Sequence, residues 1–212
     1  MGSAEDRHGG VGQLPHPFSF PFGTVAGHDE REAFTLLTRA VAGVLKNVQE
    51  GCLPLYSWAF GLPQAEWQRL IGTCFPELRT LEPAPPEFHR QLRAATSEQF
   101  AAMAALFSEH RDPHADVQES RWAAQVIAAG CMGCRPLYQD LGLRGRDEVS
   151  ALMAAYFGAL CAGNRQQLHW KRFLFAELAM RHGDAFPIRP NCSGCDNYGE
   201  CFADGRPDDT GR

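Results

Sequence analysis

Residues 30–49, EREAFTLLTRAVAGVLKNVQ, carry a clear secondary-structure pattern. Their apolar side chains recur at spacings of three and four residues, at Phe34, Leu37, Val41 and then Val44 or Leu45. This period is that of a helix with one buried face, and the acidic residues of the first turn suit the positive end of its dipole. The pattern therefore predicts a helix over about residues 30–49 that packs one face against the rest of the chain.

Helical patterns continue along most of the chain. A proline at the first helical position, Pro63, marks one start, and a capping box at residues 96–99 marks another. No stretch alternates with period two for long enough to predict a strand. The predicted fold class is therefore all-α, a single helical domain of about six to eight helices with a Cys-rich C-terminal metal-binding loop. The further helices are predicted at about residues 63–74, 87–95, 96–110, 116–131, 137–141, 146–157 and 166–182.

Composition divides the chain into three parts. Residues 1–27 are rich in glycine and proline, which disfavour helices and strands, and this predicts a flexible N-terminal arm. Residues 28–186 carry the helical patterns and form the predicted helical domain. Residues 187–212 hold three cysteines among turn-forming residues, which predicts a metal-binding segment followed by a tail.

Charge and missing signals argue against several classes of function. The 212 residues carry a formal net charge of −5 and no Lys/Arg-rich run, so we expect no nucleic-acid partner. We find no export signal and no apolar stretch of membrane-spanning length, which predicts a cytoplasmic protein with no membrane partner. The sequence also has no Gly-rich phosphate loop, nucleophile elbow or paired-carboxylate site, and we expect no conventional enzyme.

The chain has eight cysteines, and their clustering in a reducing compartment predicts metal or redox chemistry rather than disulfides. Cys192, Cys195 and Cys201 follow a C-x2-C-x5-C spacing among residues that favour tight turns. Thiolates are soft ligands, so this segment predicts an iron–sulfur or a zinc site. The cysteines that lie singly in apolar contexts are expected in the core, namely Cys52, Cys74 and Cys161.

Motifs between residues 122 and 202 resemble those of one protein family. The chain reads AGCMG at 129–133, LYQDLGL at 137–143, RDEVSALM at 146–153 and WKRFLF at 170–175, and then C-x2-C-D-N-Y-x2-C-F at 192–202. In order and spacing they are similar to the NifQ family of nitrogen-fixation accessory proteins. The resemblance implies a carrier of a molybdenum–iron–sulfur cluster. Such a carrier would supply molybdenum to the proteins that assemble the iron–molybdenum cofactor of nitrogenase.

The chain departs from the family pattern at the implied ligands. The family motif is C-x4-C-x2-C-x5-C, and its first cysteine would fall at Pro187, whose side chain cannot ligate a metal. Either three thiolates suffice, or a thiol from elsewhere completes the site. Cys134 is the leading replacement and Cys131 the next, because the two lie three residues apart at a predicted helix end and so share one face. The other reading of Cys131 is a small buried core residue. The predicted metal ligands are Cys192, Cys195 and Cys201.

Three functional classes are compatible with these cysteines. One is the molybdenum–iron–sulfur carrier, and another is an iron–sulfur redox or sensor protein. The remaining class is a structural zinc protein that uses two C-x2-C pairs, Cys131 with Cys134 and Cys192 with Cys195. A diverged homologue that has lost molybdenum transfer is the alternative to the carrier.

One group of cations has two readings. Lys171, Arg172 and Arg181 would form a basic face that orients an oxyanion such as molybdate near the Cys-rich loop, or they are solvated surface residues.

Overall fold

The structure is a computed structural model, and it describes residues 30–80, 82, 84–182, 195 and 197–201. Every regular element in these residues is a helix, which confirms the all-α fold class. None of the described helices is long and apolar enough to cross a membrane. The predicted arm at residues 1–27, Pro187 and Cys192 lie outside the described residues.

The described helices include all those that the sequence predicts and several short ones that it does not. The additions are the 3-10 helices η1 and η2 and the short helices α8 and α10. In chain order the elements are α1 (Glu30–Gln49), η1 (Leu55–Ala59), α2 (Gln64–Cys74), η2 (Pro76–Leu78), α3 (Pro86–Ala94), α4 (Glu98–Glu109), α5 (Val117–Cys131), α6 (Leu137–Asp140), α7 (Arg146–Tyr156), α8 (Gly158–Gly163), α9 (Trp170–His182) and α10 (Tyr198–Cys201).

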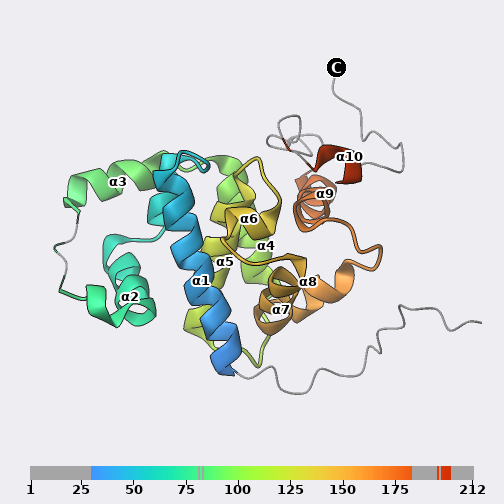
Figure 1. Ribbon diagram of the computed structural model, residues 1–212, viewed down its shortest axis with the longest axis horizontal. Coiled ribbons are helices and arrows are strands. Elements are labelled where there is room, and N and C mark those ends of the chain that lie inside the picture. Colours follow the sequence, from blue (N-terminus) through green and yellow to red (C-terminus); the bar gives the residue numbers. More distant parts are fainter. Residues whose placement is uncertain (1–29, 81, 83, 183–194, 196, 202–212) are drawn as a thin grey trace, which may run out of the picture.

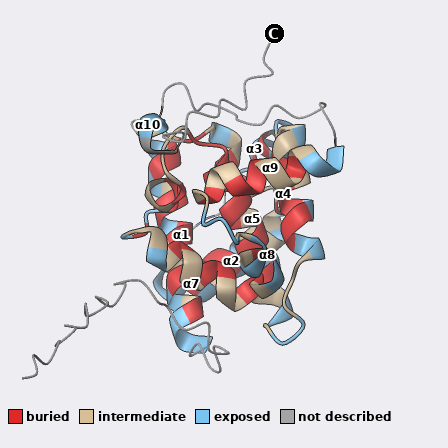
Figure 2. Cartoon of the chain, turned by 90° about the vertical axis from the view of Figure 1, so that its right-hand side faces the viewer, coloured by how far each residue is buried: buried red, intermediate tan, exposed pale blue. Residues whose placement is uncertain are grey.

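Helix α1 is central to the fold. It contacts η1 as well as α5, α6 and α7, and Figure 1 shows it between the α2–α3 side of the molecule and the α7–α8 side. Leu37, Val41 and Val44 are fully buried, as their spacing predicts, whereas Phe34 is only partly buried. The buried residues of the other helices also face inward (Figure 2), so the apolar stripes meet in one core.

The backbone of α1 touches the backbone that follows α6. A Cβ atom on Gly43 would lie 2.5 Å from the carbonyl carbon of Leu141 and 2.6 Å from the Cα of Gly142. Gly142 has a φ of +64°, in the left-handed region that glycine adopts at low cost. Close by, the Asn47 side chain donates hydrogen bonds of 2.9 Å to the carbonyl oxygens of Gln139 and Asp140. These contacts fix α6 against α1.

Helix α5 ends at Cys131, as the sequence predicts. It is capped at its start by Asp116, whose carboxylate accepts a hydrogen bond of 2.8 Å from the backbone N–H of Glu119. Its second half is almost entirely buried, and α5 packs against both α1 and α4. Helix α5 therefore brings the Cys131–Cys134 turn to the edge of the core.

Helix α9 begins at Trp170, four residues later than predicted. The reason is a local turn, in which Gln167 has a φ of +50° and cannot be part of a right-handed helix. The side chain of Asn164 closes this turn because it accepts from the N–H of Leu168 at 2.8 Å and donates to the Leu168 carbonyl at 2.9 Å. The indole N–H of Trp170 then donates to the Ser150 hydroxyl at 3.1 Å, which attaches the start of α9 to α7.

Candidate functional site

Two of the three predicted metal ligands lie in the described residues. Cys201 ends the short helix α10, and Cys195 lies just before it; both side chains are half-buried. The backbone N–H of Tyr198 donates to the Cys195 carbonyl at 3.0 Å, and that of Cys201 donates to the Asn197 carbonyl at 3.0 Å. Residues 197–201 thus form a compact helical turn that ends at Cys201. Cys192, the third predicted ligand, lies outside the described residues.

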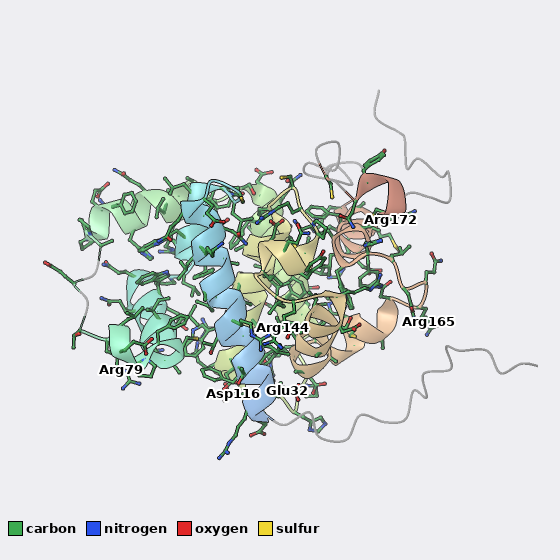
Figure 3. The ribbon with its side chains drawn as sticks, in the orientation of Figure 1. Glu32, Arg79, Asp116, Arg144, Arg165 and Arg172 are labelled. Atoms are coloured by element: carbon green, nitrogen blue, oxygen red, sulfur yellow. The ribbon has the colours of Figure 1, made fainter. Side chains whose placement is uncertain are left out.

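Helix α10 is attached to the first turn of α9. The guanidinium of Arg172 donates a hydrogen bond of 2.5 Å from Nη1 to the Cys201 carbonyl. Figure 3 shows Arg172 on α9, close to α10. Since Arg172 lies in the first turn of α9, the position of Cys201 depends on where that turn is held.

The Cys131–Cys134 turn is the second cysteine-bearing element. Cys131 is completely buried at the end of α5, and Cys134 is half-buried. Gly133 lies between them in a space that admits no side chain. A Cβ atom on Gly133 would lie 2.6 Å from the carboxyl carbon of Asp140 and 2.6 Å from a methyl group of Leu53. Glycine at this position therefore lets the Asp140 carboxylate come up against the backbone of the turn.

Asp140 is a buried ionic centre behind this turn. Its side chain is fully buried and accepts hydrogen bonds from the backbone N–H of Arg135 at 3.2 Å and from Nε of Arg135 at 3.0 Å. It also accepts from Nζ of Lys171 at 2.5 Å. Lys171 donates as well to the carbonyl of Gly133 at 2.9 Å. A carboxylate without solvent is tolerated here because cationic donors surround it.

Consecutive residues of α9 thus hold both cysteine-bearing segments. Lys171 bonds to the turn between Cys131 and Cys134, and Arg172 bonds to Cys201. Within the described residues, no three Cys, His, Asp or Glu side chains are grouped so that they could hold a metal ion. The structure therefore attaches the two segments to one helical turn, and the assignment of individual metal ligands stays a prediction.

The two cysteines of the Cys131–Cys134 turn differ in environment. Burial raises the pKa of the Cys131 thiol to about 12, with the Asp140 carboxylate acting in the same direction and Lys171 against it. Cys131 is therefore a protonated thiol at neutral pH. To ligate a metal, it would have to lose that proton, and the side chains packed around its sulfur would have to move away. Cys134 is partly accessible. The environment favours Cys134 over Cys131 as an additional ligand.

Lys171, Arg172 and Arg181 each make a contact of their own in the described residues, and neither a basic face nor a solvated surface position fits Lys171. The Lys171 side chain is largely buried against Asp140, and Arg172 bonds to the Cys201 carbonyl. Arg181, at the other end of α9, pairs with Glu109 and with Nε2 of His110. The three cations therefore serve separate contacts between helices.

The single cysteines are only partly as expected. Cys74 is buried in the core, and burial raises the pKa of its thiol to about 11. Cys161 is half-buried and packs against the core, and burial raises the pKa of its thiol. Cys52 is half-buried and is not part of the core cluster, so the prediction is wrong for Cys52. Cys52 lies in the turn after α1, and Cys161 lies on the six-residue helix α8.

Comparisons with known proteins agree on one family. Residues 40–203 match the family model described as NifQ. The chain is 27% identical over 169 residues to Protein NifQ of Azotobacter vinelandii, covering 75% of this chain and 84% of that protein. It is 31% identical over 163 residues to Protein NifQ of Klebsiella pneumoniae, covering 75% of this chain and 93% of that protein. No solved structure matches the chain.

Proposed function

This chain belongs to the NifQ family, which gives it a role in nitrogen fixation, and on that premise we propose that it is a molybdenum–iron–sulfur cluster carrier. It would supply molybdenum for the biosynthesis of the iron–molybdenum cofactor of nitrogenase. The observation that supports this proposal is the attachment of both cysteine-bearing segments to the first turn of α9, by Lys171 and Arg172.

The donor set suits such a cargo. Cys192, Cys195 and Cys201 are the proposed thiolate ligands, and thiolates are the usual ligands of iron–sulfur clusters. Cys195 and Cys201 are half-buried, so they are partly shielded and still accessible. The cluster is cargo that the chain binds and hands on, so the proposed role is that of a carrier and not of an enzyme. The proposed recipients are cofactor assembly proteins in the cytoplasm.

The fourth ligand position has two accounts, because Pro187 replaces the first cysteine of the family motif. In the first account, Cys134 is recruited to the cluster; its partial exposure and the bond from Lys171 to the neighbouring Gly133 support this. In the second account, three thiolates hold three irons of a cubane, and the molybdenum corner is left to a non-protein ligand or a histidine. The second arrangement would suit a donor that must release molybdenum.

Cys134→Ala distinguishes these two accounts. If Cys134 is a ligand, we expect the variant to contain less iron and its cluster to decay faster, because one anionic donor is lost. If three thiolates suffice, Cys134→Ala has no effect on the cluster, and Pro187→Cys slows the release of molybdenum. The measurements are iron and molybdenum per chain and the decay of the visible absorption after anaerobic reconstitution.

Cys161→Ala is the matched control. Cys161 is a half-buried cysteine on α8, and its loss should affect packing alone. Should Cys161→Ala lose as much iron as Cys134→Ala, the loss would reflect packing, and recruitment of Cys134 would be contradicted.

A further inference from the structure

We propose that Asp140 is a positioning residue for the candidate cluster site, acting through Lys171. This inference rests on the proposed function and concerns a residue that is not itself a metal ligand. Asp140 bonds to Arg135, the residue that follows the Cys131–Cys134 turn, and so holds that turn. It also bonds to Lys171 and so holds the first turn of α9. Arg172, in the same first turn of α9, bonds to the Cys201 carbonyl and so holds Cys201.

Asp140 is a fixed reference point in the fold. Its backbone carbonyl and that of Gln139 accept hydrogen bonds from the Asn47 side chain, which is itself buried on α1. The Gly43–Leu141 backbone contact holds the next residue against the same helix. The carboxylate therefore projects from a segment that is attached to the centre of the core, and the groups bonded to it are placed relative to the core.

The carboxylate is the one anion within reach of two cations at this turn, as far as the described residues go. It pairs with Arg135 at 3.0 Å and with Lys171 at 2.5 Å. A buried carboxylate is costly unless it keeps such partners, and a largely buried ammonium is equally costly without its anion. Each partner is therefore held in one position, and Lys171 is in addition held by the Gly133 carbonyl at 2.9 Å.

The link from Lys171 to Cys201 is short because it runs through adjacent residues. Successive residues on an α-helix point about 100° apart, so Lys171 and Arg172 can bond to different segments from one turn. If Lys171 loses its anion, the constraint on this turn weakens and Arg172 moves with it. Helix α9 itself stays in place, since Trp170 of the same turn is buried and bonded to Ser150, and Phe173 and Leu174 are buried. The loosening is therefore limited to the Lys171 and Arg172 side chains and the segments that they bond. A local loosening is expected, not unfolding.

Asp140→Asn in the full-length protein is the test. Asparagine keeps the shape, but it presents no charge to Lys171 and places an N–H2 group among donors. In the apo protein, we expect faster amide hydrogen exchange at residues 133–135 and also at residues 198–201, which Asp140 does not touch. In protein reconstituted anaerobically with iron, sulfide and molybdate, we expect bound iron to be lost faster to a chelator. The affinity for the metal should fall by roughly 10–100-fold, as it does when a partner that orients ligands is removed.

Two controls separate positioning from general stability. Asp147→Asn makes the same change at an exposed carboxylate on α7 and should leave both readouts unchanged. Glu148→Gln removes the partner of Arg39 between α7 and α1, away from the cysteines, and should lower the melting temperature with normal exchange at 198–201. Lys171→Met keeps the aliphatic stem and leaves the Asp140–Arg135 pair, so it should reproduce the effect even if Asp140→Asn folds poorly.

The exchange result decides the inference by itself. Faster exchange at 198–201 in Asp140→Asn or Lys171→Met, but not in Glu148→Gln, supports positioning. Exchange at 198–201 that equals the wild type in both variants overturns it. If the wild-type protein binds no cluster at all, the proposed function fails, and the exchange data still decide whether Asp140 positions α10.

Discussion

Replacement of Cys195 or Cys201 by alanine is expected to remove most of the bound metal and to leave the helical content nearly unchanged; the same is expected for Cys192. Each change would delete a proposed anionic ligand, which a cluster needs, and at the two described positions it deletes little buried apolar surface. Cys195 and Cys201 are half-buried beside a short helix at the edge of the fold, so the core does not depend on them. The measurements are metal per chain and the far-UV circular dichroism of the purified variants.

Cys52→Ala provides a matched control, because Cys52 is also half-buried and lies in the turn after α1. It should retain the full metal content. A motif variant that binds as much metal as the wild type would exclude that cysteine as a ligand.

Gly43→Ala is expected to destabilise the fold strongly. The added methyl group would overlap the carbonyl group of Leu141 and the Cα of Gly142, and these are backbone atoms that cannot rotate away. Overpacking of this kind costs about 3 kcal/mol, since α1 and the segment after α6 must separate. For a domain of this size, that corresponds to a fall of roughly 6–12 °C in the melting temperature. Thermal unfolding followed by circular dichroism measures it.

Gly145→Ala is the comparison for this prediction. A Cβ on Gly145 would meet nothing within 4 Å, and its φ of −175° is extended backbone that alanine adopts. Its melting temperature should fall by much less than that of Gly43→Ala. If the melting temperatures of the two variants fall equally, the backbone contact between α1 and the segment after α6 does not contribute to stability as proposed.

The helices with a regular apolar period could be predicted from the sequence. Helix α1 has the expected bounds, and α5 begins one residue later than expected, because a spacing of three and four residues between apolar side chains is a local signal. Helix α8 and the late start of α9 could not be predicted, since they depend on the turn that Asn164 closes and on the left-handed conformation of Gln167. These features have no periodic signature.

The candidate site could be predicted only in part. The cysteine spacing marks Cys195 and Cys201, but Asp140 looks like an ordinary polar residue in a short helix. Its importance comes from partners at Arg135 and Lys171, and the second of these is 31 residues away in sequence. Lys171 was expected at the surface for the same reason, because its partner is not a neighbour in the sequence. The AGCMG motif contains a signal that could have helped, since Gly133 is required for the close approach of Asp140.

The most direct test of the carrier proposal is the content of iron, molybdenum and zinc in anaerobically purified full-length protein. We expect a brown protein with visible charge-transfer absorption that contains several irons together with molybdenum and little zinc. A colourless protein with zinc and no iron would contradict the proposal and favour a structural zinc site. Iron without molybdenum, even after molybdate is supplied during reconstitution, would contradict the molybdenum carrier and leave an iron–sulfur redox or sensor protein.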